Sequence, residues 1–222
     1  MNLTHSDDDS WHRARRRWHD RHSLGHFPRE VPHERKRTSS LSDTANYSCI
    51  EPLRDGRRME IRALRPDDRD ELLAAVKRIA APSLYRRFFG VKRNFTETEI
   101  AFFLNIDFID HVALVAVVDE GGKPTIVGGG RYVKIEPGKA ELAFAVIDQY
   151  QNQGIGAALM RHLGMIARDA GLAELVAEVL PENLSMLKVF EKSGYCSSMK
   201  REARVIHVRL QLPQKGPVGA AR

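Results

Sequence analysis

Residues 140–156 read AELAFAVIDQYQNQGIG, and residues 157–171 continue as AALMRHLGMIARDAG. The first part is an apolar run that is typical of a buried β-strand, and it ends in a polar turn at residues 148–153. Gly171 then provides a stop signal for a helix. Between the turn and Gly171, apolar residues recur at the spacing of one helical face. These are Ile155, Leu159, Leu163, Ile166, Ala167 and Ala170. The stretch therefore predicts a strand, a glycine-containing turn and an amphipathic helix.

This turn has the features of an anion site. The start of a helix presents unpaired backbone N–H groups and the positive end of the helix dipole. Gly154 and Gly156 would let a phosphate approach the main chain where a Cβ would block it. The pattern Gln151-x-x-Gly154-x-Gly156 is neither a P-loop, which ends in Gly-Lys-Ser/Thr, nor the dinucleotide fingerprint G-x-G-x-x-G. An ordinary strand-to-helix turn is the alternative reading.

A second segment follows in order. Residues 175–180 (LVAEVL) predict a short strand, and residues 181–195 read PENLSMLKVFEKSGY. Asn183 is a suitable N-cap for the helix in that segment. Q-x-x-G-x-G followed by this E-N-containing strand and helix resembles the GNAT superfamily of N-acetyltransferases. IRALRP at residues 61–66 resembles the opening of GNAT domains. IDFIDHVALVA at residues 106–116 resembles a bacterial subgroup of the superfamily that contains the Pat-type protein lysine acetyltransferases.

The resemblance implies an α/β architecture of the α+β type. We expect the GNAT fold, a mixed central sheet of about six to seven strands flanked by helices, over residues 56–212. Residues 1–55 form an Arg/His-rich arm with few aliphatic residues, which we expect to be disordered, and residues 213–222 form a flexible tail. Gly128 to Gly130 would weaken a central strand unless a bulge or a close backbone approach requires them.

The resemblance also implies the chemistry, with acetyl-CoA as co-substrate and no metal. Glu141, in the phrase A-E-x-A-x-x-V, is the expected general base; an exposed strand-end carboxylate is the alternative. The main chain of Ala145 and Val146 would pair with the pantetheine amides. Asn183 would hold the pantetheine arm, cap its helix, or do both. The residues expected to bind the diphosphate are Gln151, Asn152, Gln153, Gly154, Ile155, Gly156 and Ala157.

One position departs from the family pattern. Many members carry, seven residues after this asparagine, a tyrosine that protonates the leaving thiolate, whereas this chain has Phe190. A thiol has a pKa near 8.5, so CoA leaves as a thiolate at a cost of about 2 kcal/mol at pH 7. Tyr195 or water would be a replacement donor.

Composition limits the remaining choices. The 222 residues carry a formal net charge of +6, with a pI of about 9.5. No apolar run reaches the ~18–20 residues of a membrane span, and the N-terminus has no secretory h-region. Two cysteines do not favour a disulfide framework, so we expect a cytoplasmic protein. In the arm, histidines recur every seven residues from His5 to His33, which we interpret as a degenerate tandem duplication without consequence for the fold. Metal capture by these histidines and a nucleic-acid contact through Arg13 to Arg17 are the alternatives.

The sequence thus predicts an acyl-CoA-dependent N-acetyltransferase that modifies a primary amine, and we expect a protein lysine as the acceptor. A small amine such as a polyamine or an amino-sugar is the first alternative acceptor. An acetyl-CoA-binding regulatory protein with weak catalysis is a second alternative, and a basic nucleic-acid-binding protein is a third. We expect no membrane partner and do not expect nucleic acid.

Overall fold

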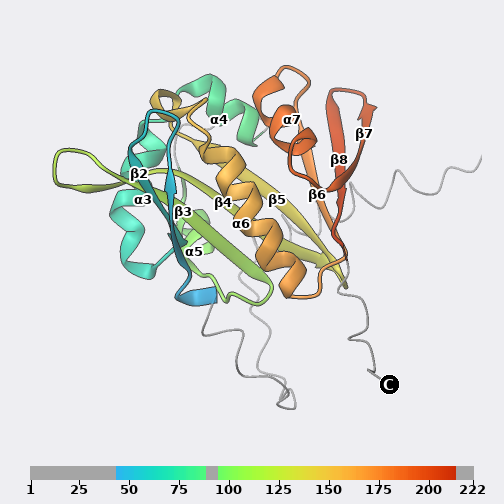
Figure 1. Cartoon of the computed structure of the whole chain (residues 1–222), viewed down its shortest axis with the longest axis horizontal. Helices are drawn as coiled ribbons and strands as arrows, with labels where there is room; N and C mark the ends of the chain where they lie inside the picture. The colour runs from blue at the N-terminus through green and yellow to red at the C-terminus, as the bar shows by residue number, and fades with distance from the viewer. Residues whose placement is uncertain (1–43, 89–94, 214–222) are drawn as a thin grey trace, which may run out of the picture.

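The computed structural model describes residues 44–88 and 95–213. The expected disorder of the arm therefore falls outside the described residues up to residue 43, and that of the tail falls outside them from residue 214. In the described part, one sheet of eight strands runs in the order β1-β2-β3-β4-β5-β6-β8-β7 (Figure 1). This is slightly more than the six to seven strands expected. The strands are β1 (Ser48–Pro52), β2 (Arg58–Ala63), β3 (His111–Asp119), β4 (Pro124–Glu136), β5 (Lys139–Val146), β6 (Glu174–Val179), β7 (Cys196–Glu202) and β8 (Val205–Gln211).

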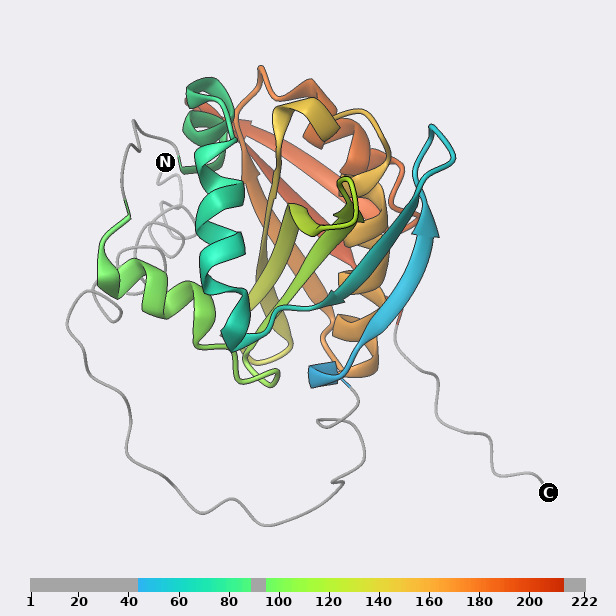
Figure 2. The same cartoon turned by 90° about the vertical axis from the view of Figure 1, so that its left-hand side faces the viewer.

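Helices cover both faces of this sheet. Helix α6 (Ile155–Asp169) crosses β3, β4 and β5 on one face and contacts α7 (Leu184–Glu191). On the other face, α3 (Arg69–Lys77) packs on β4 and α4 (Ala81–Phe88) packs on β5, with α5 (Glu97–Leu104) beside them (Figure 2). Two short 3₁₀ turns, Pro66–Asp68 and Asp148–Tyr150, precede α3 and the glycine turn. None of the described helices is long and apolar enough to cross a bilayer.

Covering both faces explains the sequence of the central strands. β3 reads HVALVAVVD and is buried at every position except its last. An antiparallel strand with one wet face would alternate polar and apolar residues, whereas a strand between two helical layers is apolar throughout. The core therefore lies on both sides of β3 and β4.

Gly128 to Gly130 do occupy a central strand, β4. The sequence left open whether a bulge or a close approach of another segment would account for glycines there. A Cβ at Gly130 would lie 2.7 Å from Cδ1 of Phe144, and one at Gly128 would lie 3.1 Å from Cγ2 of Ile155. Neighbouring elements therefore approach the β4 backbone too closely for a side chain at these two positions. The pairing of β4 with β3 also shifts register between Ala116 and Val117.

The expected start of the domain at residue 56 is wrong. β1 lies within the segment assigned to the arm, yet it pairs antiparallel along β2 from Ser48↔Arg62 to Pro52↔Arg58. Pairing with a sheet edge satisfies the backbone groups of β1 without long aliphatic side chains. Leu53, directly after β1, is 3% exposed and belongs to the core. The sheet therefore begins at Ser48.

Candidate active site

The site begins where two parallel strands separate. β5 pairs with β6 only from Lys139↔Glu174 to Glu141↔Val176, although β5 continues to Val146. Beyond that point β6 stays with β8, and β5 stays with β4. The separation opens a cleft of about 490 Å³, whose walls come from β5, β6, α4, α7 and the start of α6. A cleft at the carboxyl ends of parallel strands is a common ligand site in sheets of this kind.

The glycine turn forms the mouth of this cleft. Gly154 is the N-cap of α6 with a φ of 96°, a left-handed conformation that favours glycine. No side chain among the described residues caps this helix end, and the first helical bond runs from the Ala158 N–H to the Gly154 carbonyl at 3.0 Å. The N–H groups of residues 155–157 and the positive end of the helix dipole therefore remain available to an anion.

All but one of the residues expected around the diphosphate line the cleft. Gln153 is the exception, since it does not line the cleft. Its carbonyl accepts a hydrogen bond from the Arg54 N–H at 3.3 Å. The lining residues are Gln151, Asn152, Gly154, Ile155, Gly156 and Ala157. Ala145, Val146 and Asn183, expected to hold the pantetheine arm, line it as well.

Arg54 is a cleft residue that the sequence analysis missed. It lies in the hairpin between β1 and β2, and its guanidinium donates to the Asn152 carbonyl at 2.9 Å. Asn152 has a φ of 61°, so this bond supports a backbone conformation that a non-glycine residue rarely adopts. The two residues are 98 positions apart, and no local pattern connects them.

The Gln151 side chain holds the turn from inside. Its amide donates to the Val146 carbonyl at 3.2 Å and to the Asp148 carboxylate at 3.3 Å. Asp148 in turn accepts from the Ala80 N–H and from the Ser83 hydroxyl, both at 2.7 Å. These bonds fix the end of β5, the turn and the start of α4 relative to one another.

Glu141 lies on the cleft wall at the last residue pair before β5 and β6 separate. Arg87 of α4 lines the same cleft. Burial lowers the pKa of the Arg87 guanidinium, and the nearby charge of Glu141 opposes that shift. A carboxylate and a cation therefore lie near each other on the wall of the cleft. A second carboxylate, Glu178 of β6, lines the opposite wall.

Comparison with known proteins shows the family to which the chain belongs. A family model described as the acetyltransferase (GNAT) family matches residues 73–195, more than half of the chain. The chain belongs to the GNAT family. It is therefore an acyl-CoA-dependent N-acetyltransferase with acetyl-CoA as co-substrate, as the sequence predicted.

Three relatives place this GNAT chain more closely. An acetyltransferase of Pseudomonas aeruginosa is 32% identical over 151 residues, covering 68% of this chain and 81% of the relative. The acetyltransferase Pat of Mycolicibacterium smegmatis is 31% identical over 144 residues, covering 64% of this chain but only 42% of that protein. The crystal structure of the GNAT domain of S. lividans PAT aligns with a TM-score of 0.67 at 32% identity, covering 74% of this chain and 97% of that one. The predicted likeness to Pat-type catalytic domains is confirmed.

The family tyrosine is absent, and the structure shows what replaces it in space. Phe190 is 1% exposed and packs edge-on against Phe144, with ring centroids 6.1 Å apart. Tyr195, the replacement donor considered from the sequence, does not line the cleft. It packs instead on α6, where a Cβ at Gly164 would lie 2.7 Å from its ring. The geometry therefore gives Tyr195 a packing role in this GNAT domain.

Asn183 caps α7 as expected. Its side-chain oxygen accepts from the Met186 N–H at 3.3 Å. The same residue lines the cleft, so helix capping and contact with a ligand are compatible at this position. The side-chain amide nitrogen is the group left to donate toward a ligand.

Proposed function

We propose that this GNAT enzyme transfers the acetyl group of acetyl-CoA to lysine side chains of proteins, with Glu141 as general base. The observation that carries the proposal is the place of Glu141 at the fork between β5 and β6, inside the cleft. The relatives named Pat support a protein acceptor. We expect the enzyme to act in the cytoplasm, where its two cysteines stay reduced.

The base solves the first chemical problem, because the attacking amine must be neutral. A lysine with a pKa near 10.4 is neutral in only about one molecule in 2,500 at pH 7, which corresponds to about 4.6 kcal/mol. A carboxylate that takes the ammonium proton, directly or through one water, lowers this barrier as the nitrogen attacks the thioester carbon. Arg87 lines the same cleft, and its charge interacts with that of Glu141.

The donor would lie along the open edge of β5. We propose that the main chain of Ala145 and Val146 pairs with the pantetheine amides, and that a backbone N–H of this edge polarises the thioester carbonyl. Asn183 would donate to the pantetheine arm from the other wall. The N–H groups of residues 155–157 would hold the diphosphate at the positive end of α6.

Collapse of the tetrahedral intermediate releases the amide and CoA. With Phe190 in the position of the family tyrosine, CoA leaves as a thiolate or takes a proton from water. The thiolate costs about 2 kcal/mol at pH 7, which is small beside the barrier that the base removes.

The variant Glu141→Gln tests the general base. We expect kcat/KM to fall about 100-fold or more, while the affinity for acetyl-CoA stays within about twofold. Glu136→Gln is the matched control, because Glu136 ends β4 outside the cleft. Glu178→Gln tests the second carboxylate of the cleft. If Glu178→Gln loses turnover and Glu141→Gln keeps it, the assignment of the base is wrong.

Labelled acetyl-CoA tests the acceptor. We would incubate the enzyme with it against lysate protein and, separately, against polyamines and amino-sugars, and then map acetylated residues by mass spectrometry. We expect acetyl-lysine on proteins, and we expect it to disappear with Glu141→Gln. Turnover of a small amine with no labelled protein would refute a lysine acceptor. Isothermal titration calorimetry without acetyl-CoA binding at millimolar ligand would refute the whole assignment of the site.

A further inference from the structure

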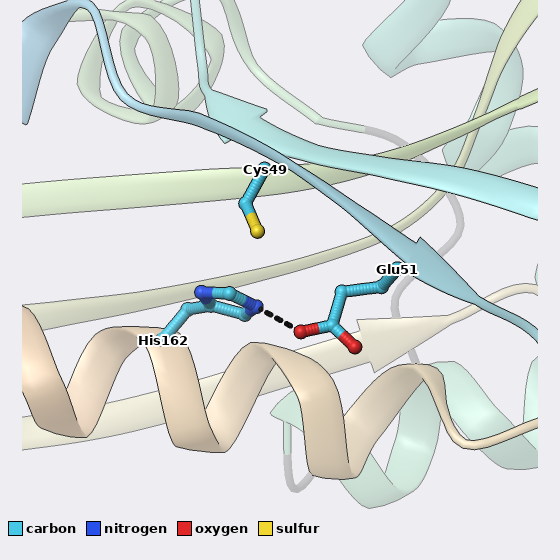
Figure 3. A group of neighbouring side chains, drawn as sticks. All are labelled: Cys49, Glu51 and His162. Carbon is cyan, nitrogen blue, oxygen red and sulfur yellow. Dashed lines mark hydrogen bonds and ion pairs between the residues drawn. The ribbon is translucent and has the colours of Figure 1, made fainter.

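A polar cluster joins β1 to α6 outside the cleft (Figure 3). Cys49 and Glu51 stand two residues apart on β1, so their side chains leave the same face of the strand. His162 of α6 points at them from the other side. Figure 3 shows the Cys49 sulfur and the Glu51 carboxylate both turned toward the imidazole. None of the three residues lines the acetyl-CoA cleft.

The three side chains bring different metal-ligand atoms close together. The Cys49 sulfur, a Glu51 oxygen and a His162 nitrogen all lie within 4.8 Å of one another. His162 is 5% exposed, and the Glu51 side chain is 20% exposed. Cys49 is a free thiol and is partly buried. The cluster is thus sheltered but still open to solvent on one side.

The imidazole and the carboxylate make short hydrogen bonds, whereas the thiol makes one long, weak bond to a neighbouring carbonyl. The His162 Nε2 lies 2.9 Å from Glu51 Oε1, and the Tyr47 hydroxyl bonds to His162 Nδ1. Arg161 contacts the same Glu51 oxygen at 2.7 Å, and this contact lowers the pKa of the Glu51 carboxyl. The recorded contact of the thiol is to the Ile50 carbonyl at 3.9 Å. A merely structural link between β1 and α6 would not need a cysteine here.

We propose that Cys49, Glu51 and His162 form a binding site for a zinc ion that cross-links β1 to α6. Sulfur and imidazole ligands favour Zn²⁺ over Mg²⁺ or Ca²⁺, which prefer oxygen. Three protein ligands leave a fourth position for water. The proposal does not depend on the acceptor or on the general base. It concerns a site separate from the acetyl transfer, for which no metal is expected.

Binding requires small rearrangements. With zinc bonds of about 2.0–2.3 Å, tetrahedral ligand atoms lie about 3.4–3.6 Å apart. His162 Nε2 and Glu51 Oε1, now 2.9 Å apart, must therefore separate by about 0.5 Å. The Cys49 sulfur, within 4.8 Å of both, must approach them by up to about 1 Å. The thiol of Cys49 releases its proton to solvent and binds the metal as a thiolate. His162 binds through the lone pair of Nε2 as the neutral tautomer whose single ring proton lies on Nδ1. That proton is donated to the Tyr47 oxygen, which fixes the tautomer of the ligand.

Cobalt(II) is the probe, because it reports on sulfur ligation. The full chain, treated with a chelator and kept reduced, would be titrated with Co²⁺ and then with Zn²⁺. We expect one equivalent of Co²⁺ to give a thiolate-to-cobalt charge-transfer band that Zn²⁺ removes. Histidines of the N-terminal arm cannot produce this band, because they offer no sulfur. At a hundredfold excess of Zn²⁺ over Kd, we expect the melting temperature to rise by about 5–10 °C.

Two cysteine variants decide the assignment. Cys49→Ser should abolish the band, whereas Cys196→Ser should keep it, because Cys196 is exposed on β7. Tyr47→Phe should keep the band and weaken Co²⁺ binding about tenfold. Circular dichroism of each variant separates loss of the ligand from loss of the fold. Absence of the band from the natural chain, its persistence in Cys49→Ser, or its loss in a folded Cys196→Ser would each overturn the proposal.

Discussion

Gly130→Ala is the substitution that tests most directly how the sheet shapes the cleft. The new Cβ would lie 2.7 Å from Cδ1 of Phe144 and 3.0 Å from Cδ1 of Leu163. Carbon atoms in optimal contact are ~3.5–4.0 Å apart, so one of these neighbours must move. Phe144 lines the cleft and Leu163 belongs to α6, so the substitution disturbs the site as well as the core.

The expected magnitude follows from two opposing effects. Forcing an extra methyl into a packed core costs about 1–3 kcal/mol. Replacing glycine by alanine also restricts the unfolded chain, which returns about 0.4–1 kcal/mol. The free energy of unfolding should therefore fall by about 1–2 kcal/mol. For a domain of this size, that lowers the melting temperature by about 2–8 °C.

Gly129→Ala is the matched control in the same strand. Its Cβ would meet the Leu114 carbonyl oxygen at 3.5 Å and the Val115 side chain at 3.9 Å, which are ordinary contacts. This variant should be as stable as the natural chain or slightly more stable. Gly128→Ala, whose Cβ would lie 3.1 Å from Ile155, should fall between the two. Thermal and urea unfolding measure the series, and calorimetry with acetyl-CoA should show weaker binding for Gly130→Ala than for Gly129→Ala. Equal stability of Gly130→Ala and Gly129→Ala would refute the reasoning.

Three further predictions concern the remaining charged contacts. Arg62 and Asp68 are both 8% exposed and share two hydrogen bonds of 2.7 Å. Asp68→Ala would leave the buried Arg62 guanidinium without its carboxylate. The free energy of unfolding, measured by urea denaturation, should therefore fall by about 3–5 kcal/mol. Asp55→Ala breaks a solvent-exposed pair and should leave the urea midpoint almost unchanged; equal losses would contradict the buried-pair argument. Burial acts to raise the pKa of the Asp68 carboxyl, but hydrogen bonds from Arg62 and the Arg65 N–H outweigh it and lower the pKa. The stabilisation by Asp68 is therefore complete above its unfolded pKa near 4 and is lost as pH falls through the lower pKa of the folded state. The free energy of unfolding of the natural chain should fall over this acidic range by an amount that Asp68→Ala does not show. Arg54→Ala removes the hydrogen bond to the Asn152 carbonyl and should weaken acetyl-CoA binding about five- to tenfold at nearly constant kcat. Arg58→Ala, at an exposed residue, is the control and should leave the affinity unchanged. Unchanged affinity in Arg54→Ala would show that the turn holds its shape without this contact.

Local sequence patterns predicted the elements that form the cleft. The strand, turn and helix over residues 139–169 are formed by near neighbours, because helical hydrogen bonds and strand burial repeat over a few residues. Asn183 as an N-cap and the family itself were also predicted correctly. Glu141 and the diphosphate residues came from the resemblance; they line the cleft apart from Gln153, and their roles remain predictions.

Contacts between residues far apart in the sequence determined the features that the sequence analysis missed. β1 has a polar composition that predicted disorder, yet the free edge of β2 orders it by pairing. Arg54 reaches Asn152 across 98 positions, and Glu51 reaches His162 across 111.

The sequence by itself thus determined the strand, the glycine turn and the helix that line the cleft, since each of these is encoded by its own residues. Only the tertiary structure placed β1 on α6, assembled Cys49, Glu51 and His162, and showed that a side chain at Gly130 would press on Phe144 and Leu163. Those features depend on which surfaces meet after folding, and hydrophobic periodicity along one segment carries no information about the partner of that segment.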